Sequence, residues 1–416
     1  MPSTSTTAAH APASERGAHR DPNVLRWLGA YVSSAIGDNV YYIALSWAAV
    51  QNGTPAQAGL VTAASALPRA VLMLGGGVIA DRYGPRRTVL ASTAVRAVLV
   101  LIAAALLLAT SPGLWLLAAV AVLFGVVDAV FLPAAGALPA RITGRGQLAR
   151  VQGMRGLATR LANILGGPLG GLGVAVGGTA GAFGLAALLV GVSLPLLLTV
   201  RVGPLAPDDT PDRGSALAEL RAGLRHVRQD PVLRPLVIAA ALSDLGFVGP
   251  MNLGLTLLAQ DRGWGSSGMG WLITGFGTGA GAASLLLTWR GRVPRAGIVA
   301  AVTNVLGAVA IASLAQTSSV AAGTCVAVCV GLLAGLAGAV TGVLIQTAAG
   351  PAYVGRVTAA STLVGFGVAP LTFPLVGWAA DLWGIGPVFV VGAAISALGS
   401  AVVLGAGSLR RAELPR

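Results

Sequence analysis

The stretch Gly75–Arg87, GGGVIADRYGPRR, ends one long apolar run, 58–80, and leads into another, 88–110. Gly77 and the glycines before it allow helices to approach closely. Gly84 permits a tight turn. A cluster of arginines between two apolar runs is typical of a cytoplasmic loop. The candidate residues of this loop are Gly77, Asp81, Arg82, Gly84, Arg86 and Arg87.

Within this loop, Asp81 is placed to hydrogen-bond the N-terminus of a neighbouring helix. The order G-x-x-x-D-R-x-G-x-R-R between two membrane-length runs resembles the loop between helices two and three of major facilitator superfamily transporters. Pro85 departs from that pattern, because the family usually has a basic residue there. The resemblance implies that the loop stabilises the conformation whose cytoplasmic side is closed. A basic loop could also be a topology signal only.

The composition predicts an integral membrane protein, since 55% of the 416 residues are hydrophobic, only 10% are charged, and the mean hydropathy is +0.80. A soluble protein of this length could not bury so much apolar surface. Runs of about 20 apolar residues, the length of a membrane-spanning helix, number twelve. They are 27–50, 58–80, 88–110, 114–138, 156–177, 180–200, 233–258, 267–289, 296–314, 320–347, 357–380 and 386–408.

The positive charge follows membrane topology rather than nucleic-acid binding. All 27 basic residues are arginine, and 24 of them lie in the tails, in alternate loops or at the helix ends facing those loops, whereas the opposite loops hold only Arg262. Arginines concentrate on the cytoplasmic side, so we expect both termini to be cytoplasmic and the arginines to attract anionic lipid headgroups. The Ala, Gly and Arg content without lysine indicates a bacterial chain in the plasma membrane.

An internal repeat at a constant offset of 206 residues predicts two related halves. Asp38 corresponds to Asp244, and Arg86 to Arg292; the trio Arg150, Pro168 and Gly171 corresponds to Arg356, Pro374 and Gly377. Such halves are typical of transporters, although a duplicated scaffold without transport is possible. We predict an all-α protein with twelve transmembrane helices in two pseudo-symmetric six-helix bundles. Its parts would be a disordered tail (1–24), an N-terminal bundle (25–200), a linker (201–232), a C-terminal bundle (233–408) and a second tail (409–416).

The linker ends in an amphipathic pattern, because Leu217, Leu220, Leu224 and Val227 recur at helical spacing. This predicts a helix that lies on the membrane surface. A solvated linker whose leucines pack on the bundle fits the sequence equally well.

The fifth run contains Gly167, Pro168, Gly170 and Gly171, which predict either a hinge or a dense seam between helices. This G-P-x-G-G order is similar to a segment of drug and metabolite exporters of the same superfamily. The text from Asp128 to Gly171, with Ser34–Asp38 and Arg96, resembles the macrolide-efflux and enterobactin-exporter branch, a group of drug:proton antiporters. The fourth run lacks the arginine motif of many proton-coupled exporters, so their proton pathway does not carry over.

Five ionisable residues lie at bilayer depth, where charge is costly and usually faces a bundle interior or an aqueous cavity: Asp38, Asp128, Asp244, Arg69 and Arg96. Distances from the helix ends pair Asp38 with Arg69 and Asp128 with Arg96, which leaves Asp244 without a cation at its depth.

A carboxylate beside arginine holds a proton poorly, whereas an unpaired desolvated one holds it better. Asp244 is then the better proton carrier and Asp38 the better gate or substrate contact. In exporters of this family, acids on the first helix often couple protons, so both acids stay candidates. All five could instead only hold helices together.

Other side chains are weaker candidates. Tyr41, Tyr42, Trp47 and Phe247 follow the two repeat-related acids and could line an apolar substrate cavity, or could face lipid or neighbouring helices. Cys325 and Cys329 fit packing positions better than a disulfide or metal site. All three histidines lie outside the apolar runs, and the absence of lysine rules out a P-loop.

These observations favour a transporter that uses the proton gradient and no cofactor or metal. We expect a monomer that exports a bulky, partly apolar small molecule, such as an antibiotic, siderophore or other secondary metabolite, by alternating access. A facilitator or importer of the same fold is the nearest alternative. A membrane-embedded enzyme would need a catalytic cluster that the sequence lacks, and a receptor or regulator that has lost transport is a further class.

Overall fold

The computed structural model describes residues 17–110, 113–203, 216–290 and 294–406, and every regular element in these ranges is helical. The elements are η1 (Ala18–Arg20), α1 (Pro22–Asn52), α2 (Pro55–Tyr83), α3 (Pro85–Ala109), α4 (Leu114–Ala137), α5 (Pro139–Ile142), η2 (Arg145–Gln147), α6 (Leu148–Leu198), α7 (Ala216–Gln229), α8 (Leu233–Gly249), the π-helical turn η3 (Pro250–Gly254), α9 (Leu255–Asp261), α10 (Gly265–Arg290), α11 (Ala296–Leu314), α12 (Val320–Trp383) and α13 (Ile385–Gly405).

Short connections join the first three long helices because the sequence places strong stop and start signals there. Pro55 and Pro85 begin α2 and α3, where a missing N–H costs nothing. Thr54 and Gln57 form a reciprocal capping box at the start of α2. Gly84 has a φ of 83°, in the left-handed region that glycine adopts without strain, so α2 turns directly into α3.

Two long helices each contain two membrane spans. Gly178 in α6 and Gly350 in α12 have φ values of 63° and 68°, which break the helical backbone. Nine helices in the described ranges are long and apolar enough to cross a membrane, and α2, bent by 62° near its middle, makes a tenth. The two halves of α6 and the 31-residue α1 complete the twelve predicted runs, each of which falls on a helix. The all-α, twelve-helix prediction is confirmed.

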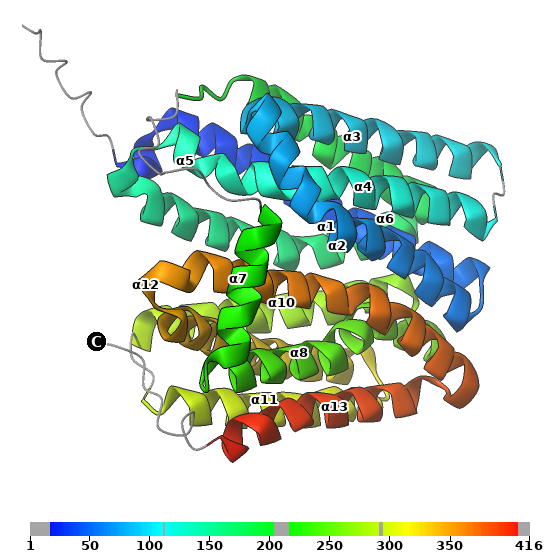
Figure 1. Ribbon diagram of the computed structural model, residues 1–416. Coiled ribbons are helices and arrows are strands. Elements are labelled where there is room, and N and C mark those ends of the chain that lie inside the picture. The colour runs from blue at the N-terminus through cyan, green and yellow to red at the C-terminus, as the bar shows by residue number, and fades with distance from the viewer. Residues whose placement is uncertain (1–16, 111–112, 204–215, 291–293, 407–416) are drawn as a thin grey trace, which may run out of the picture.

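The spans form two bundles, α1–α6 and α8–α13, which lie one above the other in Figure 1. Aromatic packing fills the interior of the first bundle: the Tyr41 ring stacks on Phe124 with centroids 3.9 Å apart and meets Phe183 edge-on. In the second bundle, Leu233 and Leu236 of α8 are buried together with alanines of α11 and valines of α12. Small residues dominate these interfaces, as expected where helices pack closely in lipid.

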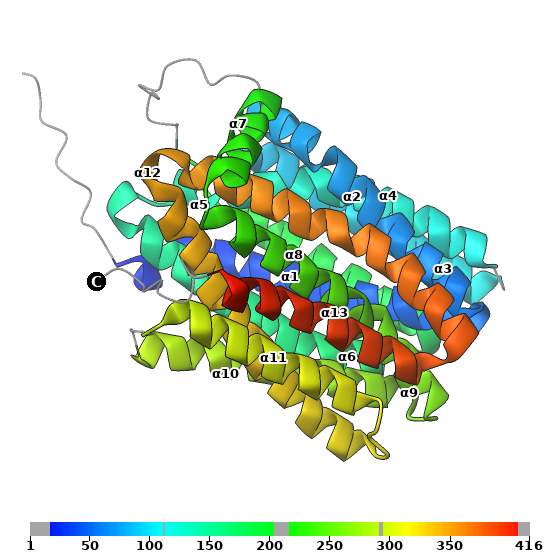
Figure 2. The same cartoon turned by 60° about the horizontal axis from the view of Figure 1, so that its bottom comes forward.

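The two bundles pack tightly at the end where α1 finishes and α2 begins. There Gly59 of α2 lies against the Phe373 carbonyl of α12, and Gly377 of α12 lies against Pro55. The Ser46 and Thr256 hydroxyls also share a hydrogen bond of 2.8 Å between α1 and α9. Figure 2 shows α9 at this end and α5 at the opposite one. Both bundles are therefore held together at one end of the molecule.

The linker helix α7 lies at the opposite end and packs on the second bundle (Figures 1 and 2). Gly223 fits against the Arg356 carbonyl of α12, and the His226 ring stacks on Tyr353 with centroids 4.2 Å apart. Val227 is buried, whereas Leu224 is 54% exposed. One face of α7 thus packs on the bundle while Leu224 points outward, so both interpretations of the leucine pattern describe part of the helix. Residues 204–215 of the predicted linker lie outside the described residues, as does the side chain of Leu217.

The predicted disordered tail is wrong over 17–24. Ala18 is buried and its N–H donates to Gln147 Oε1 at 2.9 Å, while Asp21 accepts from the Asn23 N–H and caps α1. A local capping signal and an apolar contact outweigh the polar composition of the segment. Residues 1–16, Arg292 and 407–416, on which other parts of the prediction rested, lie outside the described residues.

Candidate functional site

Four of the five membrane-depth charges meet inside the first bundle. Arg96 Nη1 on α3 donates to both carboxylate oxygens of Asp38 on α1, at 2.9 and 2.8 Å. Asp128 on α4 lies 3.6 Å from Arg96 Nη1 and 3.5 Å from Arg69 Nη1 on α2. Two arginines and two aspartates therefore form one chain of formal charge zero, Asp38–Arg96–Asp128–Arg69, which we call the charge quartet. Neutralisation by partners is what allows such charges at bilayer depth.

The predicted pairing within this set is right for one pair and wrong for the other. Depth alone paired Asp38 with Arg69 and Asp128 with Arg96. The Asp128–Arg96 pair is confirmed, with Arg69 as a second partner of Asp128, whereas Asp38 contacts Arg96 and not Arg69. Ser34 and Asp38 are one helical turn apart and present the same face of α1, and Arg96 Nη2 donates to Ser34 Oγ at 3.1 Å. Counting residues from helix ends gives depth but not the direction in which a helix face points.

Arg96 is completely buried, with its guanidinium carbon 3.6 Å from the centre of the Phe131 ring. Cation–π contact and charge pairing together replace the water that the guanidinium loses. Arg69 differs, because 18% of its side chain is exposed and the residue lines a cavity. Arg96 is therefore the fully buried member of the quartet, and Arg69 is the member that lines the cavity.

A central cavity of about 320 Å³ lies between the bundles and is lined by both. The first bundle contributes Arg69, Tyr42 and small polar side chains of α2, and the second contributes residues from α8 to α10 and from α12. Arg69 Nη1 donates to the Tyr42 hydroxyl at 3.1 Å, which fixes the guanidinium at the wall. The remainder of the second-bundle wall is mostly apolar, with Met251, Met269 and Phe276 among its side chains. A cavity of this kind, apolar with a few convergent polar groups, is the default binding site of a membrane transporter.

Three amides in this wall were missed by the sequence analysis. Asn39 Nδ2 donates to Asn163 Oδ1 at 3.2 Å, which links α1 to α6 beside the cavity. Asn252 lies in η3, a single π-helical turn of the kind often found at functional sites. Amides inside apolar runs were the signal that could have found these residues, since a polar group in lipid is costly unless it has a role.

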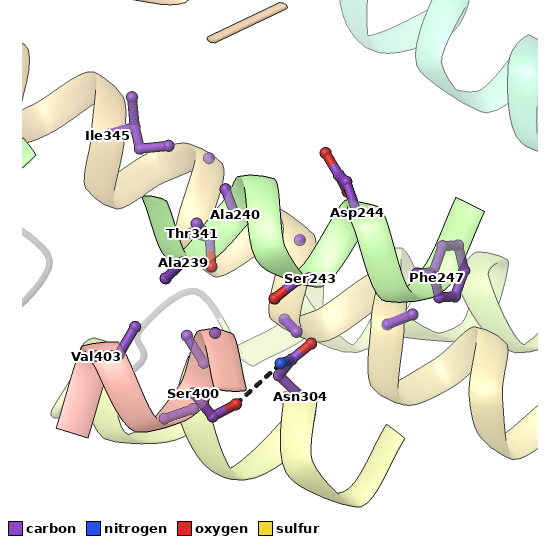
Figure 3. A pocket seen from close by; sticks show the side chains of 17 residues that line it. Ala239, Ala240, Ser243, Asp244, Phe247, Asn304, Thr341, Ile345, Ser400 and Val403 are labelled. Carbon is purple, nitrogen blue, oxygen red and sulfur yellow. Dashed lines mark hydrogen bonds between the residues drawn. The ribbon is translucent and has the colours of Figure 1, made fainter. Parts of the chain in front are cut away.

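A second cavity, of about 280 Å³, lies inside the second bundle and contains Asp244 in its wall (Figure 3). Asn304 Nδ2 donates to Ser400 Oγ at 2.9 Å across this cavity, and Figure 3 shows Asp244 pointing away from that pair. Among the described residues, the Asp244 carboxylate has neither an ion pair nor a hydrogen bond. Gly365 of α12 lies close to it. The second bundle thus holds one unpaired acid where the first holds a neutral quartet.

The aromatic candidates divide between cavity and core. Phe247 lines both cavities, and Tyr42 lines the central one. Tyr41 and Trp47 are buried and line neither cavity, so of the alternatives for these two residues the one in which they face neighbouring helices is confirmed. Successive residues on a helix point about 100° apart, so Tyr41 and Tyr42 cannot share a face.

The segment Asp81–Arg87 consists of the last residues of α2, Gly84 and the first residues of α3. Asp81 and Arg82 are exposed, and in the described part of the chain Asp81 has no hydrogen bond, so its predicted contact with a helix N-terminus is absent here. Arg86 donates to the Leu198 carbonyl at the end of α6, at 2.8 Å, and Arg87 is exposed. Of the glycines predicted to allow close approach, Gly76 does so, because it lies against the Ala129 carbonyl of α4, whereas Gly77 has open space around it.

The glycines of the fifth run form a seam between the bundles. Gly167 and Gly171 lie against Gly270 of α10, and Gly170 lies against Ile43 of α1. Pro168 is accommodated inside α6 without a break at that position. Of the two alternatives for this segment, the geometry is that of a dense seam rather than a hinge.

The remaining candidates do not form a site. Cys325 and Cys329 are both exposed, so the prediction that they are packing residues is wrong. No group of three or more His, Cys, Asp or Glu side chains close enough to hold a metal occurs in the ranges that the structure describes.

Comparisons with known proteins agree with this architecture. The family model described as Major Facilitator Superfamily matches residues 27–371. No curated protein sequence matches the chain. Among solved structures, a bacterial homologue of the human lysosomal transporter Spinster, in an inward-facing and occupied conformation, is similar with a TM-score of 0.69 and 14% identity, over 93% of this chain and 95% of that one.

Two further solved structures show the same likeness. The nucleoside transporter NupG has a TM-score of 0.70 at 13% identity, over 92% of this chain and 98% of its own. A bacterial homologue of the human drug peptide transporters PepT1 and PepT2 has a TM-score of 0.66 at 16% identity, over 95% and 98%. At these identities the likeness is one of fold.

Proposed function

This chain belongs to the Major Facilitator Superfamily, and from that premise we propose that it exports a small, partly apolar compound in exchange for protons. It is a multi-pass membrane transporter rather than an enzyme. The observation that carries the proposal is the pairing of a central cavity between the bundles with an unpaired acid, Asp244, in a cavity of its own. The sequence resemblance to the exporter branch supports the outward direction.

The charges suggest a division of roles between the two repeat-related acids. Asp38 is engaged by Arg96, which donates to both of its carboxylate oxygens at 2.9 and 2.8 Å. Asp244 has neither an ion pair nor a hydrogen bond among the described residues, so its carboxylate is free to exchange a proton. We assign proton exchange to Asp244, and we assign to Asp38 the task of holding the quartet in the geometry that presents Arg69 to the cavity.

Alternating access then follows from the packing of the bundles. We place the termini and the arginine-rich loops in the cytoplasm of a bacterial cell, with the protein a monomer in the plasma membrane among anionic lipids. On this orientation the tight end, marked by the Ser46–Thr256 hydrogen bond, is extracellular, and the described conformation is the one that faces the cytoplasm. The loop Asp81–Arg87 would act when the cytoplasmic side closes, consistent with Asp81 having no partner among the described residues of this conformation.

The test uses everted membrane vesicles energised to acidify the lumen, with a pH-sensitive dye inside. A panel of antibiotics, siderophores and small aromatic acids is added to wild type, Asp38→Asn, Asp244→Asn and the control Asp261→Asn. Asp261 is an exposed acid at the end of α9, outside both cavities. We expect one compound class to discharge the gradient with wild type and control, and Asp244→Asn to abolish the discharge while still binding the compound.

Four outcomes would each contradict part of the proposal. Full proton exchange by Asp244→Asn would remove that residue as the carrier. Substrate movement without any proton flux would make the protein a facilitator, and movement only in the opposite direction would make it an importer. Binding without movement in correctly inserted protein would favour a receptor or regulator.

A further inference from the structure

The central cavity carries a charge that narrows the class of compound it can hold. Arg69 is its one charged lining residue, and no carboxylate lines it within the described chain. The acid that balances Arg69, Asp128, lies behind the wall, is only 7% exposed and is shared with Arg96. A ligand in the cavity therefore contacts the Arg69 guanidinium directly, whereas protein atoms separate the ligand from the Asp128 carboxylate.

Arg69 also has hydrogen-bond donors left over. A guanidinium carries five N–H donors, and the Tyr42 hydroxyl and Asp128 both lie at one nitrogen, Nη1. Arg69 Nε is buried and has no hydrogen-bond partner among the described residues. A buried donor without a partner is costly, and an arginine fork is suited to binding a carboxylate through two parallel bonds.

The opposite wall suits a flat apolar body. Phe276, Phe373 and Ile273 of the second bundle line it, together with Met251 and Met269. Methionine side chains are adaptable and make favourable contacts with aromatic rings. Phe366 of the second bundle lies 5.1 Å from the Arg69 guanidinium carbon, so the guanidinium is already next to an aromatic ring.

The volume limits the size of the ligand. About 320 Å³ is at the lower end of the range for drug-sized pockets, roughly 300–1,000 Å³. A mono- or bicyclic compound suits this space better than a macrolide in the described conformation.

We infer that the central cavity binds small aromatic organic acids in their anionic form, with the acid group on Arg69 and the ring against the methionine and phenylalanine wall. This rests on the proposed function only in taking the central cavity as the substrate site. Cations are disfavoured there, because a positive group would lie beside Arg69 with no lining acid to offset it.

The test compares three compounds that share one ring system and differ in charge: 2-naphthoate, 2-naphthamide and 2-naphthylmethylammonium. Binding to purified wild type in nanodiscs of uncharged lipid is measured by equilibrium dialysis at pH 7.5, where the carboxylate is ionised. We expect 2-naphthoate to bind about tenfold more tightly than the amide, the size of effect typical of a charge-assisted hydrogen bond, and the ammonium compound to bind most weakly.

Variants then test whether Arg69 is the residue that causes the preference for the acid. Arg69→Gln should bring the affinities of acid and amide together, and Arg69→Lys should keep part of the difference. Arg262→Gln, which removes a loop arginine outside both cavities, should leave the ranking unchanged. The wild-type ranking needs no variant, so the inference stays testable if Arg69→Gln folds poorly.

Equal affinity for acid and amide, tighter binding of the ammonium compound, or no binding of 2-naphthoate would each overturn the inference. An unchanged preference in folded Arg69→Gln would do the same. The proposed export is tested separately, because the dialysis measurement needs no proton gradient. If the protein binds the anion but shows no proton-linked movement, only the export proposal is wrong. If it exports cations in exchange for protons, only the inference about anions is wrong.

Discussion

Arg96 shows how a single residue can be both buried and charged in this protein. Its side chain is fully buried, two aspartates lie within 3.6 Å of one nitrogen, and Ser34 accepts from another. Removing one member of a buried pair leaves an uncompensated charge, which costs far more than the pair contributes when intact. The quartet should therefore respond to mutation in a way that depends on which charges remain.

We predict that Arg96→Gln destabilises the protein by about 3–5 kcal/mol, because Asp38 loses its only ion-pair partner in the described chain. Adding Asp38→Asn to that variant should recover part of the loss by removing the orphaned charge. Thermal unfolding of the purified protein in nanodiscs measures both. The control variant Arg262→Gln removes a pair 3.9 Å long and a partly buried hydrogen bond to the Ala315 carbonyl, and should cost about 1–2 kcal/mol. A double variant less stable than Arg96→Gln would contradict this account.

At the scale of elements, glycines decide how closely α2 and α4 approach. Gly76 of α2 lies against the Ala129 carbonyl, and Gly125 of α4 lies against the Ser65 carbonyl, so each helix offers a glycine to the backbone of the other. Close backbone packing through small residues is a principal source of helix association in lipid. This contact also holds Arg69 and Asp128, which lie on the same two helices, within reach of one another.

The neighbouring glycines Gly76 and Gly77 offer a matched pair for testing this contact. Gly76→Ala should destabilise the protein by about 1–3 kcal/mol, since the added methyl group would overlap the Ala129 carbonyl and neither backbone can yield easily. Gly77→Ala meets open space and should be neutral or slightly stabilising, because alanine favours helix. Melting temperatures by fluorescence-detected chromatography compare the two. Equal losses, or a greater loss for Gly77→Ala, would show that the packing differs from the one described.

At the scale of the whole molecule, the two bundles are joined most tightly at one end. Glycine contacts of α2 with α12 and of α6 with α10 gather there, and Ser46 and Thr256 hydrogen-bond across the interface. Alternating access requires this end to open, so these contacts must separate in the other state. Interfaces of small residues with few hydrogen bonds are suited to this separation, because few interactions are lost when the two bundles move apart.

We predict that a disulfide between Ser46→Cys and Thr256→Cys, in a background with Cys325→Ala and Cys329→Ala, holds the protein in the described conformation. The two native hydroxyls are 2.8 Å apart, which is close enough for cysteine sulfurs to bond. Oxidation should remove both free thiols and stop substrate-linked proton movement, and a reductant should restore it. Thiol labelling and the vesicle assay measure the two effects. Transport at the full rate by completely oxidised protein would mean that this end does not open.

Several features of the protein were predictable from sequence because they depend on local chemistry. Hydropathy located all twelve spans, the 206-residue offset predicted two halves, and unusual charges in apolar runs picked out the four residues that form the quartet. Gly84 was identifiable as a turn because only a residue without Cβ takes its φ of 83° easily. Each of these depends on the transfer cost or backbone freedom of one residue or one segment.

The tertiary structure alone decided which groups meet. It joined Asp38 to Arg96 rather than to Arg69, selected Gly76 over Gly77, and placed Tyr42 in the cavity and Tyr41 in the core. These outcomes depend on how each helix is rotated against neighbours that are far away in sequence. The hydropathy of a helix hardly changes with this rotation, because lipid and the protein interior are both apolar. Packing between helices therefore determines the rotation.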